Sequence, residues 1–147
     1  MDHTWLEPFS PEECMDLLLS HAVGRVAVIV NGFPVVLPVN YRVAQHSGGT
    51  WIALRTRPGG LMDRAPQPVA LEIDGVDPAR EQGWSVLVRG SLLHVDPEAG
   101  DFRSRFDPEP WLTEDRDAWL IIEPFDISGR RLRRGDAEWP FSPDAYV

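Results

Sequence analysis

The stretch GRVAVIVNGFPVVLPVNYRV, residues 24–43, decides the fold of this 147-residue chain. Two runs rich in valine and isoleucine flank the pair Asn31-Gly32. β-Branched residues favour strands, and Asn-Gly between two such runs is the strongest short signal for a β-hairpin. The stretch therefore predicts two antiparallel strands, over residues 24–30 and 33–43.

The chain on both sides of this hairpin is also dominated by predicted strands. Ser10 and Glu13 form a capping box, and Pro11 fits the first turn, so a helix is expected over residues 11–21. A turn at residues 45–49 separates the hairpin from the next strand, and Gly90 predicts a bulge or bend. We expect further strands over residues 50–56, 69–74, 84–95, 118–122 and 125–131, one helical turn at 61–65, and a surface helix at 97–106. Strands joined mostly by hairpins favour a barrel or a sandwich.

Length and composition indicate one globular domain. The hydrophobic content is 43%, which is typical of a chain with a packed core. We expect a single domain over residues 1–147, with an ordered core at about 10–134 and a tail at 135–147. The apolar runs are too short to cross a bilayer, the N-terminus lacks the pattern of a signal peptide, and there is one cysteine. These features predict a cytoplasmic protein without a membrane partner.

The charged residues exclude several classes of function. The formal net charge is −9, which argues against a nucleic-acid partner. All fourteen basic residues are arginines, so a lysine Schiff base and a Walker-type phosphate loop are excluded. Any anion held by side chains is therefore held by arginine, whose planar fork suits phosphate.

The segment Leu54-Arg55-Thr56-Arg57-Pro58-Gly59-Gly60 is a candidate anion site. A strand delivers Arg55 and Thr56 to its end, and the following glycines allow backbone N–H groups to turn toward a phosphate. A short helix from Gly60 would add the positive end of its dipole. The alternative is an ordinary turn flanked by exposed arginines.

Two further regions can contribute to a binding site. Pro34 and Pro38 each remove a backbone N–H donor, so their strand is expected to have an irregular or free edge. The free backbone groups of such an edge, supplemented by Asn40 and Tyr41, can form hydrogen bonds with a planar heterocycle. The alternative is an edge strand protected against aggregation. Trp84 and Ser85 start one predicted strand, and Trp119, Arg130 and Arg131 follow on later strands. The aromatic and cationic side chains among them suit a flat anion. Their alternative is core packing and a solvated basic stretch.

The sequence contains no pattern for a metal site or a hydrolase. His3, His21, His46 and His94 lack the spacing of metal ligands, and no Gly-x-Ser-x-Gly unit is present. Cys14 lies on the apolar face of the predicted helix, which favours a buried small side chain over a nucleophile. No catalytic residue is assigned.

In their order, these segments resemble the pyridoxamine 5′-phosphate oxidase-like family of flavin-nucleotide-binding split-barrel proteins. The resemblance spans about residues 11–132 and includes Val23-Gly24-Arg25-Val26-Ala27, Arg55-Thr56 with its glycine turn, and Ile127-Ser128-Gly129-Arg130-Arg131. It implies a mainly β fold, namely a six-stranded antiparallel split β-barrel of Greek-key type with a few short flanking helices. It also implies a tight homodimer with two flavin sites between the subunits.

The resemblance implies a role for each candidate residue. Arg55 and Thr56 would meet the phosphate of FMN, with Gly60 in the turn. The segment Pro38, Val39, Asn40 and Tyr41 would run beside the isoalloxazine ring. The pocket would be completed by Trp84, Ser85, Trp119 and Arg130, some of them from the other subunit.

One position departs from the family pattern. Where the family turn often carries a lysine that reaches the phosphate, this chain has Leu61. The loss of one charge-assisted contact weakens binding by about 1.5–3 kcal/mol, unless Arg57 or Arg64 compensates. The leading interpretation is an FMN-dependent oxidoreductase acting on a small-molecule redox substrate. The alternatives are a non-catalytic module or sensor that binds flavin, deazaflavin or heme, and a family member without a cofactor.

Overall fold

Seven antiparallel strands and two helices make up the computed structural model, which describes residues 4–46, 48–112 and 116–135. The predicted tail beyond residue 135 lies outside these residues. In chain order the elements are β1 (Thr4–Pro8), α1 (Pro11–Ser20), β2 (Val23–Val30), β3 (Phe33–His46), β4 (Gly49–Thr56), β5 (Gln67–Asp77), β6 (Gln82–His94), α2 (Phe102–Phe106) and β7 (Ala118–Arg134). No helix in the described part of the chain is long and apolar enough to cross a membrane.

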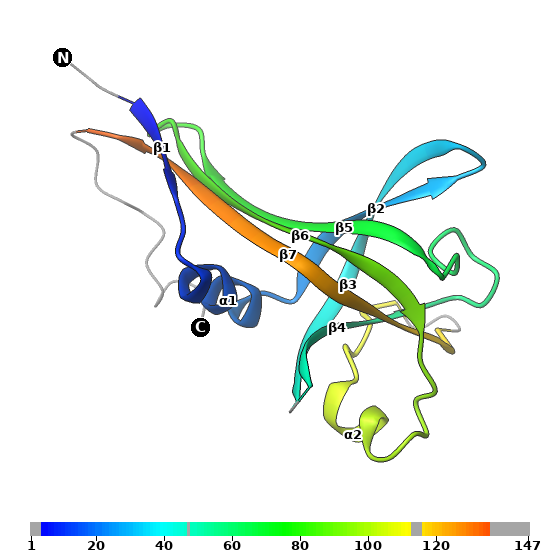
Figure 1. The fold of residues 1–147 in the computed structure, drawn as a ribbon. Helices are drawn as coiled ribbons and strands as arrows, with labels where there is room; N and C mark the ends of the chain where they lie inside the picture. Colours follow the sequence, from blue (N-terminus) through cyan, green and yellow to red (C-terminus); the bar gives the residue numbers. More distant parts are fainter. Residues whose placement is uncertain (1–3, 47, 113–115, 136–147) are drawn as a thin grey trace.

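Six of the strands close into a ring. Neighbouring strands follow the order β7-β4-β3-β2-β5-β6, and β6 pairs again with β7 (Figure 1). The predicted hairpin is confirmed, because Val30 pairs with Phe33 across Asn31 and Gly32, both at positive φ. The connection from β4 to β5 crosses the end of the barrel and places β5 beside β2 instead of β4. The predicted mainly β split-barrel class is confirmed, and the glycine turn lies on this crossing connection.

The predicted count of six strands is wrong, since the sheet contains seven. The additional strand is β1, which pairs with the far end of β7 from Thr4↔Arg134 to Pro8↔Arg130. Its sequence, TWLEP, is short and mostly exposed, and therefore shows no alternation of buried and exposed residues. Only its pairing with the other end of the chain makes it a strand.

The predicted break between two final strands is also wrong. β7 is continuous through Pro124 and pairs with β6 along its length. The register shifts between Arg89 and Gly90, whose partners are Asp126 and Pro124, so Phe125 is the extra residue of a bulge. Proline within a sheet is found at edges and bulges, because the hydrogen-bond ladder is locally disrupted there. The predicted irregularity at Gly90 is confirmed.

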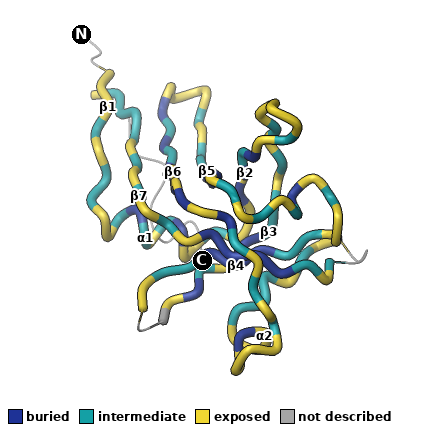
Figure 2. Tube along the Cα trace, turned by 45° about the vertical axis from the view of Figure 1, so that its right-hand side comes forward, coloured by how far each residue is buried: buried dark blue, intermediate teal, exposed yellow. Residues whose placement is uncertain are grey.

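The apolar core has two parts on opposite faces of β4 and β7, since Leu54 and Leu120 belong to the larger part and Ala53 and Ile121 to the smaller. The larger part fills the barrel and is covered by α1, whose Cys14 and Leu18 are buried (Figure 2). The capping box that starts α1 is present, with Ser10 Oγ accepting from the Glu13 amide at 3.1 Å. The smaller part contains Phe102 and Trp119 and lies beside α2.

Two helix predictions need correction. The surface helix predicted over residues 97–106 is confined to Phe102–Phe106, because only its aromatic end packs on the smaller core. The helical turn predicted at residues 61–65 is a pair of non-helical turns. There the Arg64 amide bonds the Met62 carbonyl at 2.9 Å, a bond too short in sequence to continue as a helix.

Candidate functional site

A pocket of about 410 Å³ lies at the barrel end crossed by the β4–β5 connection. Its volume is within the range of small-molecule sites, which is about 300–1,000 Å³. The walls come from β3, the end of β4, the glycine turn and the segment after α2. The lining residues are Leu37, Pro38, Val39, Asn40, Arg55, Thr56, Arg57, Gly60, Leu61, Met62, Pro110, Leu112 and Arg116.

The free edge predicted for β3 is present and forms one wall of the pocket. Residues 33–40 of β3 pair with β2, whereas only residues 41–46 pair with β4. The side of Pro38 and Val39 that faces away from β2 therefore has no strand partner within the described residues. Asn40 is held at this edge, since its Oδ1 accepts the Trp111 amide at 3.0 Å.

The glycine turn is fixed by Asp63. Gly59 lies at φ 74, and its amide donates to Asp63 Oδ2 at 2.9 Å, while the other carboxylate oxygen lies 2.6 Å from His94 Nε2. The Gly59 amide, together with His94, holds the pKa of Asp63 below its ordinary value. The Gly60 amide bonds the Arg57 carbonyl at 2.9 Å. Both glycine amides thus stabilise the turn itself and are already used.

Other donors around the pocket remain available. Among the residues that the structure describes, the Thr56 hydroxyl, the Arg57 guanidinium and the Leu61 and Met62 amides have no hydrogen-bond partner. All four groups belong to residues that line the pocket. Hydroxyl, guanidinium and amide N–H groups are the donors that phosphate-binding sites use. The donor set therefore fits a phosphate ester, even though the helix predicted to add its dipole is absent.

Arg55 is held from three sides. Its Nη1 donates to Asp107 Oδ1 at 3.0 Å and Oδ2 at 3.3 Å, and its Nε donates to the Arg116 carbonyl at 3.0 Å. The guanidinium lies 4.8 Å above the Trp119 ring. Nη2 has no hydrogen bond to any described residue. Arg55 therefore ties the end of β4 to the segment after α2 and keeps one nitrogen for a ligand.

Six of the eleven candidate residues meet at this pocket, and the structure places the other five elsewhere. Pro38, Val39, Asn40, Arg55, Thr56 and Gly60 line it. Tyr41 is buried in the barrel, where its hydroxyl donates to the Leu18 carbonyl at 2.7 Å and burial raises the pKa of the phenol. Trp119 lies beneath Arg55 in the smaller core.

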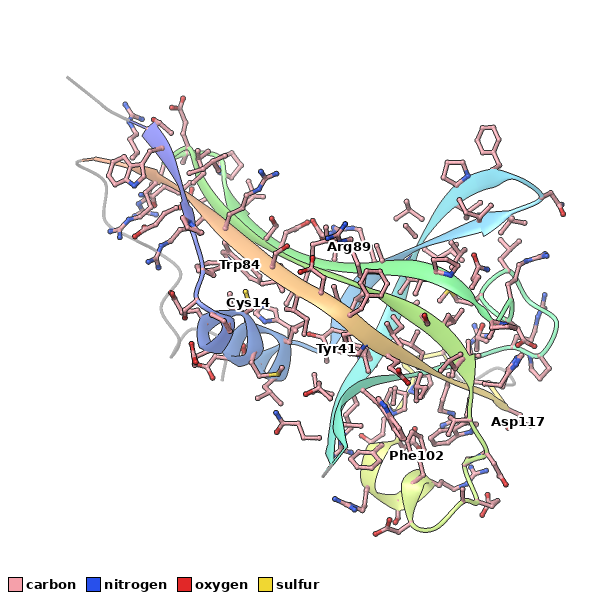
Figure 3. All side chains as sticks on the ribbon, viewed as in Figure 1. Cys14, Tyr41, Trp84, Arg89, Phe102 and Asp117 are labelled. Carbon is pink, nitrogen blue, oxygen red and sulfur yellow. The ribbon has the colours of Figure 1, made fainter. Side chains whose placement is uncertain are left out.

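The remaining three candidates lie at the opposite end of β7. Trp84 is buried near α1, with its ring 5.0 Å from that of His21 (Figure 3). Ser85 pairs with Arg130 across the β6–β7 ladder. These residues do not contact the pocket of their own chain.

Sequence reasoning missed the residues that the segment after α2 contributes. Asp107, Pro110, Leu112 and Arg116 carry no local motif, and Asp107 reaches Arg55 over a separation of 52 positions. Only the fold brings the two together. No local signal in the sequence pointed to these residues, because the 23 acidic residues offer Arg55 many possible partners.

Comparison with known proteins finds sequence similarity over most of the chain. A family model described as "Pyridoxamine 5′-phosphate oxidase" matches residues 10–131. The uncharacterized protein Rv0080 of Mycobacterium tuberculosis is 35% identical over 129 residues, covering 82% of each chain.

Solved structures show the same fold. A FAD binding protein from Mycobacterium smegmatis superposes with a TM-score of 0.64 at 30% identity, over 88% of this chain and all of that one. A protein of unknown function, DIP1874 from Corynebacterium diphtheriae, superposes with a TM-score of 0.71 at 23% identity, over 85% of this chain and 96% of that one.

Proposed function

Since the chain belongs to the pyridoxamine 5′-phosphate oxidase family, we propose that it binds a flavin nucleotide in the pocket at the barrel end. The observation that carries the proposal is the set of available donors around Thr56, Arg57, Leu61 and Met62, next to the open edge of β3. Donors on one wall suit a phosphate. An unpaired strand edge on another wall suits the ring system, whose polar edge can bond backbone groups.

The ligand we propose is FMN, with FAD and a deazaflavin nucleotide as the related choices. All three carry a phosphate on the ribityl chain, so the same donors serve each of them. The M. smegmatis relative is described as a FAD binding protein, which makes FAD a direct comparison in any binding assay. Arg57 is an exposed cation that lines the pocket together with Leu61, and we propose that it replaces the usual lysine.

The proposed activity is that of an oxidoreductase. A bound flavin supplies electron and hydride transfer, so the protein need not provide an acid or base of its own. The chain's residues would hold the phosphate, align the ring along Pro38–Asn40 and exclude water through the apolar wall of Leu37, Met62 and Leu112. The substrate and the electron donor are small molecules under this proposal.

A second candidate function is a flavin-binding protein without catalysis, and Leu61 favours it. This leucine is 47% exposed and lines the pocket where a cation would strengthen phosphate binding. Weaker binding suits a carrier or sensor better than an enzyme that must retain its cofactor.

Flavin titration tests the proposal directly. The purified protein is titrated with FMN, FAD and riboflavin while flavin fluorescence and absorbance are followed. We expect saturable binding with both nucleotides preferred over riboflavin. The absence of binding by any flavin contradicts the proposed function. Bleaching of the bound flavin by a nicotinamide donor then distinguishes an oxidoreductase from a carrier.

Leu61→Lys is expected to tighten FMN binding by about tenfold, since one charge-assisted contact contributes about 1.5 kcal/mol or more. Riboflavin, which lacks the phosphate, should bind as before. Fluorescence titration of both ligands measures the difference. Leu61→Met, which keeps an uncharged chain of similar length, is the matched control. Equal affinities for Leu61→Lys and wild type would mean that Arg57 already fills the position of the missing charge.

We further propose a homodimer, formed through the outward face of β2 and β3. Val36, Ala27 and Ala70 form one row across three strands, and Ile29 and Val36 are more than half exposed. A partner subunit would cover these apolar side chains and would bring its own Trp84, Ser85 and Arg130 within reach of a flavin. Light scattering after size exclusion should give twice the mass of one chain. The mass of one chain would contradict this assembly.

A further inference from the structure

Asp107 places a negative charge on the arginine that is proposed to meet the phosphate. Both of its carboxylate oxygens lie within hydrogen-bond range of Arg55 Nη1, at 3.0 and 3.3 Å. The pair is largely shielded, since the Arg55 and Asp107 side chains are 18% and 29% exposed. In such surroundings a charge pair is screened far less than on an open surface. Arg55 is therefore nearly neutralised before any ligand arrives.

The carboxylate is fixed by its own segment. Asp107 Oδ1 also accepts the Glu109 amide at 2.9 Å, and the Asp107 carbonyl accepts from Arg42 Nη1 at 3.4 Å. Two residues further on, the Trp111 amide is bound to Asn40. Asp107 thus belongs to a chain of contacts that runs from the end of β4 to the open edge of β3.

From this geometry we propose that Asp107 determines the ligand specificity of the pocket by competing with the ligand phosphate for Arg55. The inference rests on the proposed flavin function and adds a residue that sets the preference between phosphorylated and unphosphorylated ligands. A phosphate that approaches the available Nη2 lies beside the carboxylate, and two anions at one guanidinium repel each other. Asp107 therefore lowers the affinity for FMN and FAD while it leaves that for riboflavin nearly unchanged.

The opposing interpretation is that Asp107 orients Arg55 and so strengthens phosphate binding. Asp107→Asn separates the two. Asparagine keeps the size of the side chain and an oxygen that accepts from Arg55 and from the Glu109 amide, but it removes the charge. Competition predicts tighter phosphate binding in this variant, and orientation predicts weaker binding.

The test measures dissociation constants of riboflavin and FMN for wild type and for Asp107→Asn. We expect the preference for FMN over riboflavin to rise by about tenfold in the variant, which is the effect of about 1.4 kcal/mol. Asp101→Asn is the matched control, because Asp101 is an exposed carboxylate next to the same helix, 3.7 Å from Arg105. It should leave the preference unchanged. An unchanged or reduced preference in Asp107→Asn overturns the proposal.

A second measurement needs no flavin. Inorganic phosphate is added to each protein and the melting temperature is recorded. Phosphate should stabilise Asp107→Asn at lower concentration than wild type, and the gain should vanish in the double variant Asp107→Asn/Arg55→Gln. If no flavin binds but phosphate stabilises Asp107→Asn at lower concentration than wild type, the proposed flavin function is refuted and the role of Asp107 is supported. If flavins bind with an unchanged preference, the role of Asp107 fails alone. If no flavin binds and phosphate stabilises both proteins equally, both proposals are refuted.

Discussion

Gly90→Ala is expected to lower the free energy of unfolding by about 3 kcal/mol, the upper end of the usual cost of overpacking. A Cβ at this position would meet the Glu123 carbonyl oxygen, and it would lie 2.9 Å from both the Glu123 carbonyl carbon and Pro124 Cα. These obstacles are backbone atoms of the neighbouring strand, so they cannot move aside as a flexible side chain can. The clash lies at the bulge where β6 and β7 change register.

Chemical and thermal denaturation measure this effect. For a chain of this size, about 3 kcal/mol corresponds to a fall in melting temperature of roughly 6–12 °C. Ser91→Ala is the matched control, because Ser91 is the next residue of β6, is exposed and already has a Cβ. A stability for Gly90→Ala equal to that of Ser91→Ala would show that the two strands do not approach this closely.

Arg55→Ala is expected to weaken FMN binding by about 100-fold, the value of a strong charge-assisted hydrogen bond. The substitution removes the cation and leaves the Asp107 carboxylate without the guanidinium that it pairs with. The remaining negative charge then repels the phosphate. Riboflavin has no phosphate, so its affinity should change by less than about threefold.

Titration with both ligands separates loss of the anion site from general damage. Arg42→Ala is the control, since Arg42 contacts the Asp107 carbonyl at 3.4 Å and does not line the pocket. It should leave both affinities near those of wild type. Equal losses of FMN and riboflavin in Arg55→Ala would mean that the segment after α2 has collapsed, and that Arg55 does not meet the phosphate.

Local features of the chain were predicted well because neighbouring residues determine them. The tight turn between β2 and β3 requires positive φ at both central positions, which Asn31 and Gly32 adopt readily. The capping box of α1 lies within four consecutive residues, Ser10–Glu13. The two prolines in β3 predicted a free edge, because a residue without an N–H cannot donate a hydrogen bond to a neighbouring strand.

Within the candidate site, the sequence predicted the wall at the end of β4 but did not predict the wall formed by the segment after α2. Arg55, Thr56 and Gly60 are close in sequence, so a single segment placed them together at the pocket. Asp107, which pairs with Arg55, and the lining residues Pro110, Leu112 and Arg116 come from a distant segment that has no recognisable motif. Their position depends on how α2 and β7 pack against the end of β4.

By itself the sequence determined the class of fold, the hairpin, the cap of α1 and the arginine-glycine turn at the end of β4. The tertiary structure alone decided that β1 joins the far end of β7, that β7 runs unbroken through Pro124, and that Arg55 is paired with Asp107. Each of these contacts joins segments far apart in the chain, so it can form and stabilise the protein only when the barrel closes. The arginine-glycine turn is a general anion-binding pattern in the sequence. The carboxylate beside it in the folded chain sets how strongly an anion binds.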